Sequence, residues 1–141
     1  MSSVFFGPSP VKTPDGMTWD VPAGWEQGRG AWGGMVVSGV VRAATLAIGS
    51  ELPVRSVSVQ ILGPVLAGST AIDVDPLRKG SNTSSVNIRL VQADEVKANA
   101  VVVFGAARVP DVALQGDDAP PSAPSWHDVP SIPLDGAPTF A

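Results

Sequence analysis

Hydrophobic and polar residues alternate first with the period of a strand, near the start of this 141-residue chain. The stretch VKTPDGMTWDV (11–21) holds two short runs on either side of Pro14-Asp15-Gly16. Proline followed by Asp-Gly is a strong turn signal, so these residues are predicted to form a β-hairpin. Residues 22–30 carry no such period and are predicted to form a loop.

The period then changes to that of a helix over residues 32–48. The apolar residues keep the i, i+3, i+4 spacing of one helix face: Trp32, Met35, Val36, Gly39, Val40, Ala43 and Ala47. The polar stripe on the other side is narrow and consists of Ser38, Arg42 and Thr45. A helix that is apolar on most sides is buried in a core or wrapped by a sheet. Gly49 and Pro53 are predicted to end it.

Four strand-like runs follow, at residues 54–62, 69–77, 84–92 and 96–109. The first places Val57, Val59 and Ile61 on one face, and the third places Val86, Ile88 and Leu90 on one face. The last run is apolar on both faces, which is typical of a central strand. Because the links between consecutive runs are short, consecutive strands are predicted to be antiparallel neighbours.

The order of elements predicts an α+β fold in which a curled antiparallel sheet wraps one long central helix. We assign residues 1–109 to this domain. Residues 110–141 hold seven of the fourteen prolines. They are predicted to form an extended tail, either a linker or an arm on a surface, because proline removes donors and fixes φ. Its apolar residues are expected to dock as isolated anchors: Trp126, Ile132, Leu134 and Phe140.

Composition narrows the function further. The chain has no cysteine, which excludes disulfides and thiolate metal sites. We expect no other metal or cofactor, and we expect a cytoplasmic protein because no leader or membrane-spanning run is present. All nine Lys and Arg lie in residues 1–109 and form no basic patch, so nucleic acid is not an expected partner. A charged fraction of 16% is low for a free surface, which indicates burial against another chain or domain.

The stretch GRGAWGG (28–34) precedes the helix, and its first six residues fit the dinucleotide-binding pattern G-x-G-x-x-G. That function requires a strand before the first glycine and a parallel strand after the helix, and neither is predicted here. Two other roles remain open. Glycines at a helix start let a ligand approach unpaired backbone N–H groups, which could stabilise a developing oxyanion. Alternatively, Gly33 and Gly34 only let the helix pack tightly.

Several short motifs in order resemble one family: GRGAWGG, VRAA, PVRSV, GPVLAG, LRKGS, LVQ and VVFGAAR, within residues 24–109. The chain resembles the first half of thioesterase-like, double-hotdog proteins related to bacterial acyl-CoA thioesterase II. The resemblance implies a hotdog fold, in which a sheet wraps a long helix. It also implies an acyl-CoA ligand and a second hotdog, supplied by the same or another chain.

In the family, an Asp at the helix start, a Thr on the next strand and a Gln on the last strand act in the second hotdog. The matching residues here are Trp32 or Gly33, Val54 and Val103, and none of them can transfer a proton. Catalytic residues therefore stay unassigned. His127, the only histidine, lies in the tail, and Ser38 lacks the G-x-S-x-G context of a serine hydrolase.

The substrate-binding residues that we predict lie in two groups. Trp32, Gly33 and Gly34 form the helix start. The turn Arg78, Lys79, Gly80 and Ser81 offers cations and backbone donors that suit the phosphates or pantetheine of coenzyme A, although an ordinary hairpin turn has the same composition. Arg42 is expected to pair structurally and Gln92 to end its strand. The sequence leaves two hypotheses: a thioesterase-like domain working with a second hotdog, or a non-catalytic acyl-binding or scaffold domain.

Overall fold

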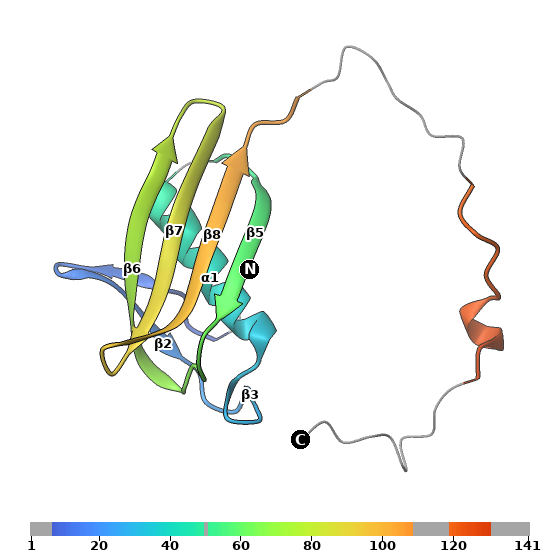
Figure 1. Ribbon diagram of the computed structural model, residues 1–141, viewed down its shortest axis with the longest axis horizontal. Helices are drawn as coiled ribbons and strands as arrows, with labels where there is room; N and C mark the ends of the chain where they lie inside the picture. The colour runs from blue at the N-terminus through green and yellow to red at the C-terminus, as the bar shows by residue number, and fades with distance from the viewer. Residues whose placement is uncertain (1–6, 50, 109–118, 131–141) are drawn as a thin grey trace. The chain divides into compact units, whose positions relative to one another are not determined.

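The computed structural model describes residues 7–49, 51–108 and 119–130, shown coloured in Figure 1. Contacts divide the chain into two units, Met1–Ala107 and Arg108–Ala141. In the second unit, residues 119–130 hold one 3-10 helix, η1 (Trp126–Asp128), whose start is capped by the Ser125 hydroxyl. Three of the four expected tail anchors, Ile132, Leu134 and Phe140, lie outside the described residues.

The first hairpin forms as predicted, from β1 (Val11–Thr13) and β2 (Gly16–Val21) paired antiparallel. The prediction of a plain loop over 22–30 was wrong. Two residue pairs, β3 (Glu26–Gln27) and β4 (Gly30–Ala31), form a small hairpin of their own. Gly28 starts its two-residue turn with a φ of 72°, a conformation that glycine adopts without strain.

Helix α1 (Gly33–Ile48) matches the prediction to within one residue. Trp32 is the residue before the helix rather than its first residue, and it is 47% exposed instead of buried. The helix ends at Gly49, which takes the left-handed conformation at a φ of 58° and donates its N–H to the Thr45 carbonyl. Glycine is favoured there because other residues pay a steric cost at positive φ.

The main sheet has six strands in the order β1-β2-β6-β7-β8-β5. Its long strands are β5 (Val54–Ile61), β6 (Gly68–Lys79), β7 (Thr83–Gln92) and β8 (Glu95–Gly105), all antiparallel to their neighbours. In Figure 1, α1 lies across one face of these strands. The α+β hotdog architecture predicted from the sequence is confirmed.

One predicted strand neighbour was wrong. β5 pairs with β8 at the edge of the sheet and not with β6, although only residues 62–67 separate β5 from β6. These residues cross the ends of β8 and β7 instead of turning back. The N–H groups of Leu62 and Gly63 donate to the Lys97 carbonyl at 2.8 and 3.1 Å, and the Gln92 side chain binds Leu66. Side-chain and loop contacts thus override the expectation that a short link joins two neighbouring strands.

The core lies between α1 and the inner face of the sheet. The helix contributes its predicted face, with Met35, Val36, Val40 and Ala43 at most 1% exposed. The strands contribute the inward residues of β7 as predicted, alternate residues of β8 from Ala98 to Phe104, and Trp19 of β2. The ring of Trp19 lies where a Cβ on Gly39 would be, at 2.5 Å, so this glycine lets helix and sheet approach closely.

The sheet covers only one side of α1, whereas the sequence predicted a helix that is buried or wrapped on most sides. On the outer side, Val37 and Val41 are half-buried and Leu46 is 37% exposed. The inward face of edge strand β5 is also poorly covered, because Val57 and Ile61 are 36% and 53% exposed. Apolar surface therefore stays open on α1 and along β5.

Candidate functional site

The start of α1 presents two unpaired backbone donors. The N–H of Trp32 donates to the Trp25 carbonyl at 2.8 Å, and the N–H groups of Met35 and Val36 donate to the Trp32 carbonyl. Within the described residues, the N–H groups of Gly33 and Gly34 donate to no protein acceptor. No acidic side chain stands in the first turn, so the partial positive charge of the helix start is not neutralised locally.

Three glycines around this helix start have different surroundings. A Cβ on Gly30 would meet the Pro64 and Val65 backbone at 3.0 Å, which makes it a packing position. A Cβ on Gly34 would meet the Trp32 ring at 2.6 Å, so the half-exposed indole lies over this glycine. A Cβ on Gly33 would meet only the Ile61 side chain, at 3.6 Å. Of the two glycines for which a packing role was weighed, Gly34 lies against Trp32, whereas open space remains at Gly33.

A cleft of about 290 Å³ lies beside the helix start. The β3–β4 hairpin, the first turn of α1, the end of β5 and the crossover loop line it. Its exposed apolar side chains are Ile61 and Leu62, and its polar side chains are Gln27 and Arg29. The lining residues are Gln27, Arg29, Gly30, Ala31, Val36, Ile61, Leu62, Gly63, Pro64 and Val65. Hydrogen bonding fixes one wall, because the Ala31 N–H donates to the Val65 carbonyl at 2.7 Å.

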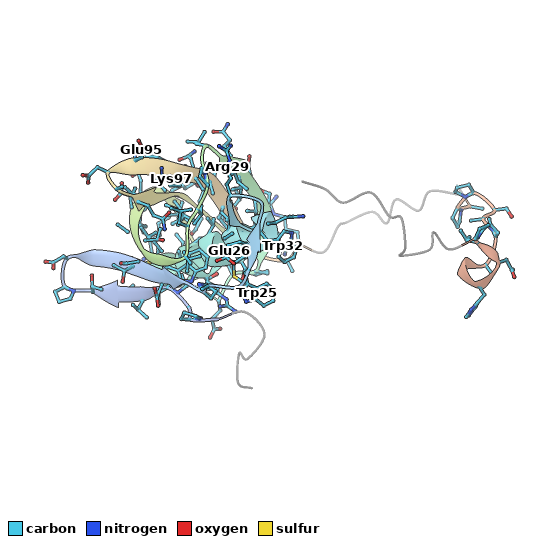
Figure 2. The ribbon with its side chains drawn as sticks, turned by 90° about the horizontal axis from the view of Figure 1, so that it is seen from below. Trp25, Glu26, Arg29, Trp32, Glu95 and Lys97 are labelled. Atoms are coloured by element: carbon cyan, nitrogen blue, oxygen red, sulfur yellow. The ribbon has the colours of Figure 1, made fainter. Side chains whose placement is uncertain are left out.

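Exposed apolar side chains surround the same end of the domain. Trp25 and Trp32 are 37% and 47% exposed, and Figure 2 shows them close together. Ile61 and Leu62, at 53% and 60%, belong to the cleft itself. Large exposed apolar side chains that gather in one place indicate a binding surface for a ligand or for another domain.

Sequence reasoning missed Arg29, the only ionisable residue that lines this cleft among the described residues. The signal available in the sequence was the position of Arg29 between two glycines, Gly28 and Gly30, which is typical of a turn. Glu26, the nearest acid along the chain, accepts a hydrogen bond from the Gly24 N–H at 2.8 Å. Figure 2 labels both side chains.

The predicted turn of Arg78, Lys79, Gly80 and Ser81 lies at the other end of the sheet. Strands β5, β8, β7 and β6 lie side by side in the sheet. Lys79 of β6 lies at the end of the sheet where β5 begins, whereas Ile61 lies at the opposite end, near the helix start. The turn is closed by the Gly80 N–H donating to the Thr83 carbonyl at 3.0 Å. Within one copy of this chain, the two predicted groups of site residues do not meet.

The positions that match the family's catalytic residues are also separated. Val54 begins β5 opposite Phe104, far along the strand from Ile61. Val103 follows the buried Val102 on β8, so its side chain faces the outer side of the sheet. Trp32 and Gly33 alone lie at the helix start. No carboxylate lines the cleft among the described residues.

Two polar residues have structural roles. Gln92 ends its strand as predicted, but its amide also binds the backbone of Leu66 and the hydroxyl of Thr70. Arg42 donates to the Ser9 hydroxyl at 3.3 Å, in agreement with a structural partner.

A larger hollow of about 1050 Å³ lies between the β1–β2 hairpin and β6. Its charged residues include Asp73 and Arg89, which pair with each other at 3.5 Å. It touches neither the helix start nor the crossover loop. The smaller cleft therefore remains the candidate site despite its size.

Comparison with known proteins identifies the family. The profile of the acyl-CoA thioesterase N-terminal domain matches residues 21–105, more than half of the chain. This protein therefore belongs to that thioesterase-like hotdog family. A search of curated protein sequences found no match.

Solved structures share the fold. A hotdog protein of unknown function from Alicyclobacillus acidocaldarius has a TM-score of 0.68 and 23% identity, and the match covers 81% of this chain and 42% of that one. A candidate thioesterase II from Thermobifida fusca has a TM-score of 0.65 and 19% identity, and the match covers 80% of this chain and 43% of that one. An acyl-CoA thioesterase II from Mycobacterium marinum has a TM-score of 0.58 and 24% identity, and the match covers 70% of this chain and 38% of that one. The chain spans less than half the length of these proteins.

The described residues contain neither a cluster of metal ligands nor a helix that could span a membrane. No group of three or more His, Asp or Glu side chains is placed to hold a metal ion in the described residues. No described helix combines the length and the apolar character needed to cross a bilayer.

Proposed function

We propose that this chain is one hotdog of a two-hotdog assembly that binds and hydrolyses acyl-CoA thioesters. The observation that carries the proposal is the pair of N–H groups at Gly33 and Gly34, which find no acceptor among the described residues and lie beside the cleft. Backbone donors aimed at a thioester carbonyl stabilise the negative charge that its oxygen gains during attack by water. The family membership supports the same class of ligand.

The second hotdog would cover the open apolar surface. Among the described residues, edge strand β5 has no neighbour on its outer edge, and its inward residues Val57 and Ile61 are partly exposed. The outer side of α1, with Val41 and Leu46, is also uncovered by the described residues. An unpaired strand edge beside exposed apolar side chains is a template for adding another strand. We propose that two hotdogs, from one chain or two, join along β5.

Such a pairing would also explain the separation of the predicted site residues. If two β5 strands pair antiparallel, the Val54 end of one lies beside the Ile61 end of the other. The turn Arg78–Ser81 of one hotdog would then approach the helix start of its partner. Its cations and backbone donors suit the phosphates of coenzyme A. We propose residues 110–141 as a linker or arm.

The general base would come from the second hotdog. No carboxylate lines the cleft in the described part of this chain, and the helix carries none from Gly33 to Ile48. The loss of general acid–base help typically costs about 10²–10⁴-fold in rate. This chain alone is therefore expected to bind acyl-CoA with weak or no turnover.

A thiol-release assay tests this proposal. Purified residues 1–141 are incubated with short and long acyl-CoAs, alone and with a second hotdog of the same family. We expect turnover only in the combined sample. Turnover near about 10 s⁻¹ by the chain alone would contradict the assignment of the base, and Asp73, Asp75 and Asp94 would be the carboxylates to mutate first. Binding without turnover in every combination would favour the non-catalytic hypothesis.

A further inference from the structure

Arg29 is held over the cleft by the packing of its own hairpin. It occupies the second position of the two-residue turn between β3 and β4. The next residue, Gly30, is buried against Pro64 and Val65 so tightly that a Cβ would meet their backbone at 3.0 Å. The Ala31 N–H then donates to the Val65 carbonyl. These contacts fix the backbone of Arg29 against the crossover loop.

The charge of Arg29 has no protein partner. Within the described residues, no carboxylate lies within ion-pair distance of its guanidinium, and its side chain makes no hydrogen bond. Glu26 is bound to the Gly24 N–H instead. Arg89, by comparison, pairs with Asp73, and Lys97 pairs with Glu95.

The other walls of the cleft select the kind of ligand. Ile61 and Leu62, at 53% and 60% exposure, offer apolar side chains to a ligand, while Gln27 adds one neutral polar side chain. Two exposed apolar side chains beside one cation that has no partner among the described residues suit a ligand that joins an apolar segment to an anionic group. The unneutralised start of α1 has the same sign and reinforces this preference.

We infer that Arg29 binds an anionic group of the acyl thioester, so that the cleft selects ligands with a negative charge beside a short apolar segment. This inference rests on the proposed function and specifies its ligand. Two sources can supply the charge: a carboxylate at the end of a short acyl group, or a phosphate of coenzyme A. A volume of about 290 Å³ is at the low end for ligand pockets, which limits the apolar segment to a short one.

Four thioesters separate these sources. Succinyl-CoA carries both anions, butyryl-CoA carries only the phosphates, succinyl-N-acetylcysteamine carries only the carboxylate, and butyryl-N-acetylcysteamine carries neither. Calorimetry measures their affinity for residues 1–141 and for the variants Arg29→Gln, Arg29→Lys and Arg89→Gln. Arg89→Gln is the matched control, because it removes one arginine charge from the outer face of the sheet.

Arg29→Gln should weaken at least one anionic thioester about tenfold or more, which is typical for a lost charge-assisted hydrogen bond. It should leave butyryl-N-acetylcysteamine within about twofold, and Arg29→Lys should restore part of the affinity. A loss on succinyl-N-acetylcysteamine assigns the acyl carboxylate, and a loss on butyryl-CoA assigns the phosphate. Arg89→Gln should change none of the four.

Provided that the wild-type chain binds, two results would overturn the inference alone. Arg29→Gln could lose affinity equally for all four thioesters, or it could lose affinity for none of them. The first would mean that Arg29 shapes the cleft without meeting an anion. If the wild-type chain binds none of the four, the proposed function itself is contradicted. Circular dichroism of each variant checks that the fold is intact.

Discussion

The Gln92 side chain binds both backbone groups of Leu66. Its carbonyl oxygen accepts from the Leu66 N–H at 2.9 Å, and its amide donates to the Leu66 carbonyl at 2.8 Å and to the Thr70 hydroxyl at 2.8 Å. Gln92 ends β7, and Leu66 lies in the crossover loop between β5 and β6. One side chain thus fastens the loop that lines the candidate cleft.

Replacing this amide should loosen the crossover. Gln92→Leu removes all three hydrogen bonds and leaves the buried Thr70 hydroxyl with fewer partners. We expect the free energy of unfolding to fall by about 2–3 kcal/mol. Urea denaturation followed by tryptophan fluorescence measures it, with Gln60→Ala on the exposed face of β5 as the control. A change below about 0.5 kcal/mol in Gln92→Leu would contradict the fastening role.

Two glycines of α1 should respond differently to a methyl group. Gly39 lies against the buried Trp19 ring, and Gly34 lies under the half-exposed Trp32 ring. Gly39→Ala should therefore cost about 1–3 kcal/mol of stability through overpacking. Gly34→Ala should stay within about 1 kcal/mol, because Trp32 can swing outward and alanine favours the helix. Thermal unfolding of both variants checks the difference, and equal losses would refute it.

A larger side chain at Gly34 should block the ligand. Gly34→Val displaces Trp32 and crowds the unpaired N–H groups of the first turn, so we expect acyl-CoA binding to be lost more than stability. Parallel binding and unfolding measurements test this, with Gly39→Ala as a variant destabilised away from the helix start. If Gly34→Val loses binding only in proportion to stability, the glycine is needed for packing alone.

The open edge of β5 should mediate association. Ile61→Lys places a charge on the exposed apolar edge, where burial of an unpaired charge is costly. We expect it to weaken association at least about tenfold, whereas Ala71→Lys on the outer face of β6 should leave it unchanged. Sedimentation velocity at micromolar concentration measures both. A stable monodisperse monomer of the wild-type chain would contradict self-association along β5.

One surface ion pair sets a pH response. The hydrogen bond from Lys97, together with its charge, holds the pKa of Glu95 below its ordinary value of 4.5. A carboxyl group with a lowered pKa in the folded state stabilises the fold above its unfolded pKa, and this contribution is lost as the pH falls through the folded pKa. Lys97→Met should therefore raise the pKa of Glu95 in an NMR titration. An unchanged value would show that the pair does not persist in solution. Because Glu95 is fully exposed, its effect on stability should be small.

The sequence by itself determined the elements and the fold class. Hydrophobic period is a local property, so the helix over Gly33–Ile48 and the long strands were predicted within a few residues of their ends. The inward face of β7 followed from alternation. The ordered motifs, which resemble a family of double hotdogs, agreed with the family profile over residues 21–105.

Only the tertiary structure decided which segments meet. The place of β5 beside β8 depends on the hydrogen bonds to Gln92 and Lys97, which join residues about thirty positions apart and have no periodic signature. Packing of Gly30 against Pro64 and Val65, with the hydrogen bond from Ala31 to Val65, brings Arg29 over the crossover loop, while the turn at Arg78 lies at the far end of the sheet. Non-local packing, rather than the spacing of residues along the chain, decides which side chains share a site.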